Sequence, residues 1–456
     1  MIVSLNPATG AELARFKLQG EEAVEHALDA ATAAQRKWRR TAPEHRAALL
    51  RRIAQALRSD KAELARLISL EMGKPLLEAE AEIEKCAINC DFYADSGLKF
   101  LADTAMPSNA SESLVVHDPL GVVLAIMPWN YPFWQFFRFL APALIAGNGA
   151  ALKHAANVPL CAKAIEDLLV KAGAPNGLVI NLVVENTAVA GLIADPRIAA
   201  VTLTGSTQVG MIVASQAGKA LKKQVLELGG SDPFIVLADA DLELAADAAV
   251  KARYLNTGQS CINAKRFLVV DAVADQFVDL FVARAQQLKM GDPFEPGVQI
   301  GPMARANLRV ALDDQVQRTV SAGGWLRLGG MPAAGPGFFY PPTIIDHVLP
   351  HMAAFREETF GPVAAITRVA DEDEALTMAN DTEFGLGASI WTRDLSRAKA
   401  FARRIDAGAV FINGVVASDP RLPFGGVKHS GYGRELGEQG MKEFMNTKTI
   451  WIGPAV

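Results

Sequence analysis

Cysteine is scarce in this sequence, and its scarcity restricts the class of protein. Only four cysteines occur in 456 residues, too few and too dispersed for a disulfide framework. This is typical of a reducing compartment, so we expect a cytoplasmic protein. Cys86 and Cys90 lie four residues apart in a helical pattern, but no His or Cys pair follows at zinc spacing. We therefore expect both thiols to pack in the core and predict no metal site.

The sequence also lacks a strong charge excess and a long uninterrupted apolar run. A net charge of −5 gives no basic stripe for nucleic acid. No basic-then-apolar segment follows Met1, so we do not expect secretion. The most apolar window, 128–152, contains Asn130, Arg138, Pro132 and Pro142, which favours a buried helix over a membrane span. We expect neither a nucleic-acid partner nor a membrane.

Helical and strand patterns alternate along most of the chain. Ala-, Glu- and Leu-rich segments predict helices at 21–40, 43–59, 61–72 and 76–102. Short apolar runs at 122–127, 150–153, 179–184 and 198–203 are each followed by an amphipathic segment. A second series of such units follows Phe234. Repeated units of this kind predict an α/β fold with two doubly wound, mostly parallel sheets, whose ligands bind beyond the carboxyl ends of strands.

Two β-type runs far apart in the sequence have no obvious place in these sheets. They cover residues 111–118 and 446–452, and we predict that they pair with each other as an arm.

The stretch 223–266 has the most chemical character. Glu227 ends a predicted strand, and Gly229 and Gly230 let backbone approach a ligand closely. A helix over 239–253, capped by Asp239 or Asp241, leads to a small polar turn that ends at Cys261. A thiol on such a turn can act as a nucleophile with backbone N–H groups beside it, while a carboxylate activates water. Taken alone, Cys261 could equally be a buried small residue, and Glu227 a solvated one.

Six sequence motifs, taken in order along the chain, indicate a common function for these residues. Together they resemble the NAD(P)-dependent aldehyde dehydrogenase superfamily over most of the chain. The motifs are MPWNYP (Met127–Pro132), LTGST (Leu203–Thr207), ELGGSDPFIV (Glu227–Val236), NTGQSC (Asn256–Cys261), EETFGP (Glu357–Pro362) and PFGGVKHSGYGRE (Pro423–Glu435).

This resemblance implies a reaction and a role for each matching residue. Cys261 would attack an aldehyde to form a thiohemiacetal, whose oxyanion the Asn130 amide and the Cys261 backbone N–H would hold. Hydride transfer to the nicotinamide would leave a thioester, and Glu227 would activate the water that hydrolyses it. The residues implied in cofactor binding are Trp129, Lys153, Gly205, Ser206, Leu228, Glu358 and Phe360.

Cofactor and substrate choice depend on fewer positions. Members strict for NAD often have Lys-Pro-x-Glu, where this chain has Lys153-His-Ala-Ala156, so both NAD and NADP stay open, with NAD slightly preferred. The chain is most similar to the shorter bacterial succinate-semialdehyde dehydrogenases, which implies oxidation of succinate semialdehyde to succinate. Arg138 would bind the distal carboxylate and Ser418 would assist. A second arginine that some of those enzymes use is Leu255 here.

The same resemblance implies a domain plan and a homo-oligomer, either a dimer or a tetramer. We expect a Rossmann-like cofactor-binding domain over 1–107 and 123–229, a catalytic domain over 230–429, and a small β oligomerisation arm over 108–122 and 441–456. Two alternatives remain: a dehydrogenase for another short aldehyde, and a cofactor-independent cysteine hydrolase that uses Cys261 and Glu227.

Overall fold

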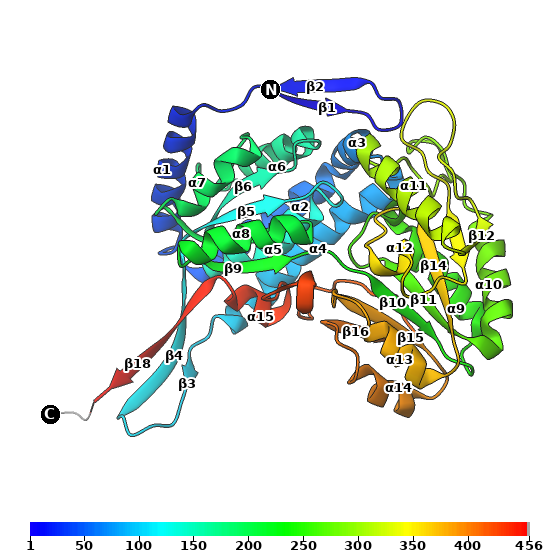
Figure 1. The fold of residues 1–456 in the computed structure, drawn as a ribbon. Coiled ribbons are helices and arrows are strands. Elements are labelled where there is room, and N and C mark those ends of the chain that lie inside the picture. Colours follow the sequence, from blue (N-terminus) through cyan, green and yellow to red (C-terminus); the bar gives the residue numbers. More distant parts are fainter. Residues whose placement is uncertain (454–456) are drawn as a thin grey trace.

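Two lobes, each built on a mostly parallel sheet, make up the body of the protein, and a thin sheet projects from one of them (Figure 1). The structure is a computed structural model that describes residues 1–453. The predicted α/β class with two doubly wound sheets is confirmed.

The first sheet has a strand order that reverses at its centre. Buried residues alternate along its central strand: Val123 and Ala125 face one core, and Val122 and Leu124 face the other. The strands lie in the order β17 (Gly431–Tyr432), β9 (Lys223–Glu227), β8 (Ile198–Thr204), β5 (Val122–Met127), β6 (Gly149–His154) and β7 (Val179–Asn181), all parallel except β17.

Helices cover both faces of this sheet. One face carries α5 (Trp134–Ala146) and α6 (Pro159–Lys171), with α2 (Pro43–Ser59), α3 (Lys61–Met72) and α4 (Leu76–Phe100) packed outside them. The other face carries α1 (Glu21–Trp38), α7 (Val189–Ala194), which the 3-10 turn η1 (Asn186–Ala188) precedes, and α8 (Thr207–Lys219). The four predicted N-terminal helices are confirmed, two of them ending two residues earlier than expected. Every residue of α5 is buried, as the sequence predicts.

The second sheet forms the core of the other lobe. Its order is β12 (Trp325–Leu328), β13 (Thr343–Asp346), β14 (Val363–Val369), β11 (Ala264–Val270), β10 (Asp232–Val236), β15 (Gly387–Trp391) and β16 (Ala409–Ile412). Helices α9 (Leu242–Tyr254) and α10 (Asp271–Ala285) pack on one face. The other face carries α11 (Ala306–Ser321), α12 (Ala353–Arg356), α13 (Glu372–Asn380) and α14 (Leu395–Ala402).

The projecting sheet contains the two runs that have no place in the lobes. β18 (Met445–Ile452) pairs antiparallel with β4 (Glu112–Pro119) along its whole length, and β3 (Thr104–Ala105) joins the other edge of β4. The predicted long-range pairing is therefore confirmed. Residues 454–456 of the predicted arm lie outside the described residues.

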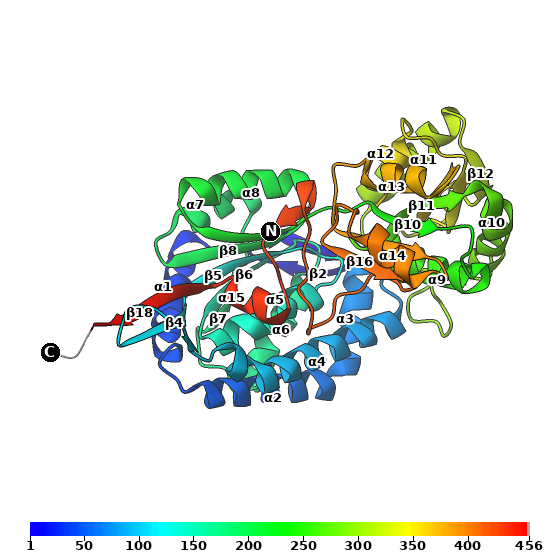
Figure 2. The ribbon, with the colours of Figure 1, turned by 90° about the horizontal axis from the view of Figure 1, so that it is seen from below.

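Several connections could not be foreseen from local pattern. A hairpin of β1 (Ile2–Leu5) and β2 (Glu12–Phe16) precedes α1, and β12 lies inside the Gly-rich stretch 323–337. After β16 the chain returns to the first lobe through η3 (Lys428–Ser430), β17 and α15 (Gly437–Lys442), as the view from below shows (Figure 2). Within residues 1–453, no helix is long and apolar enough to cross a membrane.

Candidate active site

Two cavities meet at Cys261. The first, of about 360 Å³, is lined by residues that follow β5 and β8, including Asn130 and Gly205; we call it the switch-point cavity. The second, of about 210 Å³, lies between α4, α5 and the 415–418 segment and includes Arg138; we call it the α4–α5 cavity. Because strand order reverses between β5 and β8, the first cavity lies where doubly wound sheets bind ligands.

A strained turn carries the thiol. Asn256, Thr257 and Gly258 of the turn η2 (Leu255–Gly258) all have left-handed backbone, with φ of 57°, 54° and 71°. At Gly258 a Cβ atom would lie 2.3 Å from the Gly361 carbonyl oxygen, so only glycine fits there. Two consecutive non-glycine residues in this region cost free energy that the surroundings must offset.

Hydrogen bonds from distant elements hold this turn. The Asn256 N–H donates to the Glu78 carboxylate, and its side-chain amide donates to the carbonyls of Asn130 and Gln259. The buried Arg253 guanidinium donates to the Gly258 and Gly361 carbonyls at 2.6 Å each. The position of Cys261 is therefore set by α4, by the segment that contains Asn130 before α5, and by the 359–361 segment together.

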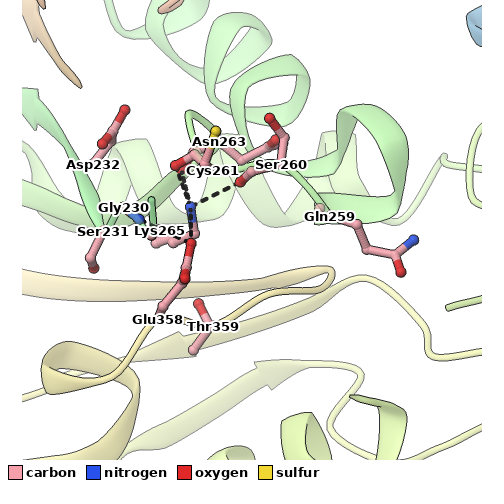
Figure 3. Close-up of polar contacts among 12 residues, drawn as sticks. Gly230, Ser231, Asp232, Gln259, Ser260, Cys261, Asn263, Lys265, Glu358 and Thr359 are labelled. Carbon is pink, nitrogen blue, oxygen red and sulfur yellow. Dashed lines mark hydrogen bonds and ion pairs between the residues drawn. The ribbon is translucent and has the colours of Figure 1, made fainter. Parts of the chain in front are cut away.

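Lys265 lies below the segment that follows the turn and contains Cys261 (Figure 3). Its fully buried ammonium donates to the carbonyls of Ser260, Cys261 and Asn263 at 3.0, 2.7 and 3.2 Å, and lies 3.6 Å from a Glu358 oxygen. Burial lowers the pKa of Lys265, and Glu358 opposes this. Since those carbonyls point to Lys265, the lysine fixes the backbone on both sides of the thiol.

We expect Lys265→Met to destabilise the fold and slow catalysis. The change leaves three carbonyls without their donor and Glu358 without its cation, so the free energy of unfolding should fall by about 3–5 kcal/mol in urea titrations. Lys163→Met, which removes an exposed lysine paired with Asp167, should cost less than about 1 kcal/mol. Equal stability of the two variants would contradict this role.

Asn130 and the Cys261 backbone offer two hydrogen-bond donors near the sulfur. The Gln135 amide donates to the Asn130 side-chain oxygen at 3.1 Å, which turns the Asn130 NH₂ group toward the Gln259 carbonyl, also at 3.1 Å. One of the two N–H bonds of that NH₂ group is left over. Within residues 1–453 the Cys261 backbone N–H has no acceptor. These two donors are suited to an oxyanion at the cavity junction.

The charge of Glu227 acts on the Cys261 thiol, but Glu227 lines neither cavity. It ends β9, as predicted, and is 2% exposed. Neither of its carboxylate oxygens has a hydrogen-bond partner among residues 1–453, and a Cβ atom at Gly425 would lie 2.7 Å from one of them. Burial raises the pKa of Glu227, and the neighbouring Glu435 carboxylate raises it further, against Arg138 and Arg434. Glu227 is thus a carboxyl group able to take up a proton near neutral pH.

The surroundings of Cys261 favour the protonated thiol. Burial is the main cause that raises the pKa of Cys261, to about 12; Glu358 and Glu227 act in the same direction, against Arg138 and Lys265. The sulfur therefore loses its proton as it attacks, and the carbonyl oxygen, which becomes a hydroxyl, can take that proton up.

The predicted cofactor residues line one cavity, with one exception. Trp129, Gly205, Ser206, Leu228, Glu358 and Phe360 all line the switch-point cavity. Lys153 does not; its ammonium donates to the Asn186 side chain at 2.5 Å, and burial lowers its pKa. The implied role of Lys153 in cofactor binding therefore stays a prediction.

The chemistry of this cavity fits a dinucleotide. Ser206 caps α8, and the backbone N–H groups of residues 206–208 have no acceptor within the described 453 residues, so they can receive a pyrophosphate. The Glu358 carboxylate accepts from the Gly230 N–H at 3.1 Å and can also accept from ribose hydroxyls. Trp129 and Phe360 meet edge to face with ring centroids 5.8 Å apart, forming an aromatic wall.

The two predicted substrate residues line the α4–α5 cavity but have protein partners. The Arg138 guanidinium forms a buried ion pair with Glu435 and donates to the Thr204 hydroxyl at 3.2 Å. The Ser418 hydroxyl accepts from the Lys85 ammonium at 2.7 Å. Sequence reasoning missed Lys85, Lys265 and Glu435, because each joins the site through contacts that no local pattern reveals.

Comparison with known proteins agrees with this geometry. The sequence model of the aldehyde dehydrogenase family matches residues 1–450. The NAD(P)+ succinate semialdehyde dehydrogenase Sad of Escherichia coli (strain K12) is 51% identical over 98% of this chain and 97% of that protein. The probable NADP(+) succinate-semialdehyde dehydrogenase of Synechocystis sp. (strain ATCC 27184 / PCC 6803 / Kazusa) is 48% identical over 99% of both.

A solved structure is similar over the whole length. Succinic semialdehyde dehydrogenase from Streptococcus pyogenes, crystallised with NADP+ as the cofactor, superimposes with a TM-score of 0.97 at 38% identity, covering 100% of both chains.

Proposed function

The chain belongs to the aldehyde dehydrogenase family, and we propose that it oxidises succinate semialdehyde to succinate with NAD or NADP. The observation that carries the proposal is the position of Cys261 at the junction of two cavities, one suited to a dinucleotide and one to a small aldehyde. Relatives named as succinate-semialdehyde dehydrogenases, 46–51% identical over nearly the whole chain, support the substrate.

Cys261, Asn130 and Glu227 divide the reaction between them. Cys261 adds its sulfur to the aldehyde carbonyl, the thiol proton passes to the former carbonyl oxygen, and the Asn130 amide and the Cys261 N–H donate to that oxygen. A nicotinamide held in the switch-point cavity would supply the hydride acceptor for this adduct, whose hydroxyl proton passes to solvent. Glu227 then takes a proton from the water that cleaves the remaining thioester, which releases the acid and the free thiol.

Both cofactors are expected to support turnover. Ala156, exposed after β6, places no carboxylate where one would repel a 2′-phosphate. Relatives named for NADP(+) or NAD(P)+ agree with acceptance of NADP. Trp129, Gly205, Ser206, Leu228, Glu358 and Phe360 would bind the nicotinamide half and the pyrophosphate, and Lys153 the adenosine ribose.

A substrate panel with both cofactors tests the proposal. We expect reduction of NAD and NADP with succinate semialdehyde, and a kcat/KM at least about tenfold higher than with butanal, since an anionic substrate gains a charged contact. Higher kcat/KM with butanal would make the enzyme a dehydrogenase of another short aldehyde. Thioester hydrolysis without any cofactor reduction would favour a cysteine hydrolase.

The assembly, domains and location are part of the same proposal. We propose a homo-oligomer, dimer or tetramer, joined through the exposed β18 edge of the projecting sheet. We assign cofactor binding to residues 1–107 and 123–229, catalysis to 230–429, and the arm to 108–122 and 441–456. Four free cysteines support a location in the cytoplasm.

A further inference from the structure

Lys85 reaches the α4–α5 cavity from the middle of α4. Its ammonium donates to the Ser418 hydroxyl at 2.7 Å and lies 4.3 Å from the centre of the Trp134 ring. The same cavity contains Cys261. The lysine and the thiol therefore open into one space although they are far apart in sequence.

No carboxylate of the described chain, residues 1–453, forms an ion pair with Lys85. The two acidic side chains whose charges act on it have other partners. Glu82 forms a buried ion pair with Lys74 and accepts from the N–H groups of Phe133 and Trp134. Asp419 binds the Arg421 guanidinium through both oxygens. The Lys85 ammonium therefore has no carboxylate partner within the described chain.

Burying the Lys85 ammonium without a counter-charge costs free energy when no ligand is bound. Burial, with a smaller contribution from Arg138, lowers the pKa of Lys85 to about 8. A largely buried ammonium is stable when it is paired, and a hydroxyl and an aromatic face compensate only part of its lost hydration. An anion in the cavity would supply the missing charge.

The other buried cation that lines the cavity, Arg138, is already paired and is less available to bind an anion. Arg138 is 3% exposed and is neutralised by Glu435. Glu78, the remaining acid at the wall, accepts the Asn256 N–H, and burial raises its pKa to about 7, so its repulsion of an anion is weakened. Leu255, at the position where some related enzymes use a second arginine, carries no charge. Lys251, which also lines the cavity, is exposed to solvent, so the unpaired positive charge of the buried part of the cavity lies at Lys85.

We propose that Lys85 and Ser418 form the site that binds the distal carboxylate of an ω-carboxy aldehyde, with Arg138 serving chiefly to hold Glu435. This assignment rests on the proposed aldehyde oxidation, because Cys261 must bind the other end of the same molecule. Trp134, Val415 and Phe424 give the cavity an apolar wall section that suits a short methylene chain. Lys85 is thus a residue that determines specificity for acidic aldehydes.

The test compares Lys85→Met with wild type on succinate semialdehyde and butanal. Loss of a charge-assisted hydrogen bond should lower kcat/KM for succinate semialdehyde roughly 10- to 100-fold, mainly through KM. The effect on butanal should stay below about threefold, because butanal has no carboxylate to lose a contact. Lys85→Arg, which restores the charge, should recover most of the preference.

Lys99→Met is the matched control. Lys99 lies on α4 like Lys85 but is exposed and lines neither cavity, so its removal changes the net charge equally while leaving the buried cation in place. It should change kcat/KM for either aldehyde by less than about twofold. A loss as large as that of Lys85→Met would show that general charge attraction, not a specific site, selects the substrate.

Inhibition by succinate separates this inference from the proposed function. Succinate should inhibit butanal oxidation competitively in wild type and at least about tenfold more weakly in Lys85→Met. If wild type does not oxidise succinate semialdehyde, the proposed function is wrong, whatever succinate does. If wild type prefers succinate semialdehyde and Lys85→Met keeps both the preference and the succinate inhibition, the assignment of Lys85 is overturned.

Discussion

Cys261→Ala is expected to abolish aldehyde oxidation, with turnover lowered at least about 10⁴-fold, because no other group at the cavity junction can form a covalent adduct. Dinucleotide binding should persist, since the residues of the switch-point cavity are untouched. Stopped-flow absorbance of the reduced cofactor measures the first expectation, and titration of the cofactor by fluorescence measures the second.

Cys161→Ala is the control for this variant. Cys161 lies in α6, is fully buried and lines neither cavity. Its removal should leave kcat within about twofold, although the small cavity that it creates can lower stability by about 1 kcal/mol. Oxidation above background by Cys261→Ala would refute the assigned nucleophile.

Glu227→Gln is expected to separate the two halves of the reaction. The first turnover should still reduce about one cofactor per site, and steady-state turnover should then fall about 10²–10⁴-fold, because the amide cannot take a proton from water. In wild type, burial and Glu435 raise the pKa of Glu227. The fraction of active carboxylate, and with it kcat, should therefore increase as pH rises through neutrality, and this dependence should disappear in the variant.

Glu166→Gln provides the comparison for Glu227→Gln. Glu166 is a glutamate of α6 whose pKa burial also raises, yet it lies away from Cys261 and both cavities. It should keep wild-type kcat and pH dependence. Absence of the initial burst in Glu227→Gln would mean that Glu227 is required before the thioester forms.

Patterns that repeat with the period of a strand or helix allowed much of the fold to be predicted. The apolar run at 122–127 and the amphipathic segments at 21–40 and 43–59 became β5, α1 and α2 with small boundary changes. The pairing of β4 with β18 followed from both runs being β-type and lacking a partner nearby. Asp241 caps α9, one of the two caps considered.

What the sequence could not show is how side chains from distant segments meet. Lys85 and Ser418 are 333 positions apart, and Lys85 occupies an ordinary polar position of an amphipathic helix. Glu435 reaches Arg138 only because β17 returns the chain to the first sheet. A β-strand of two residues is too short to show the periodic pattern from which a strand is predicted.

The left-handed backbone conformation of Asn256 and Thr257 could not be predicted from the sequence either. Neither residue type requires positive φ, and the conformation is held by Arg253, Glu78 and Asn130 from outside the turn. Local propensity therefore gives no sign of the strain that presents the thiol.

Mass analysis of the trapped enzyme tests the central claim, that Cys261, Asn130 and Glu227 act together on one carbonyl beside a bound nicotinamide. Glu227→Gln is mixed with succinate semialdehyde and NADP, quenched in acid during the slow phase, digested and mapped. The account predicts one succinyl group per chain, as a thioester on the peptide that contains Cys261, and none when the cofactor is omitted. A succinyl group on another residue, or equal labelling without the cofactor, would contradict it.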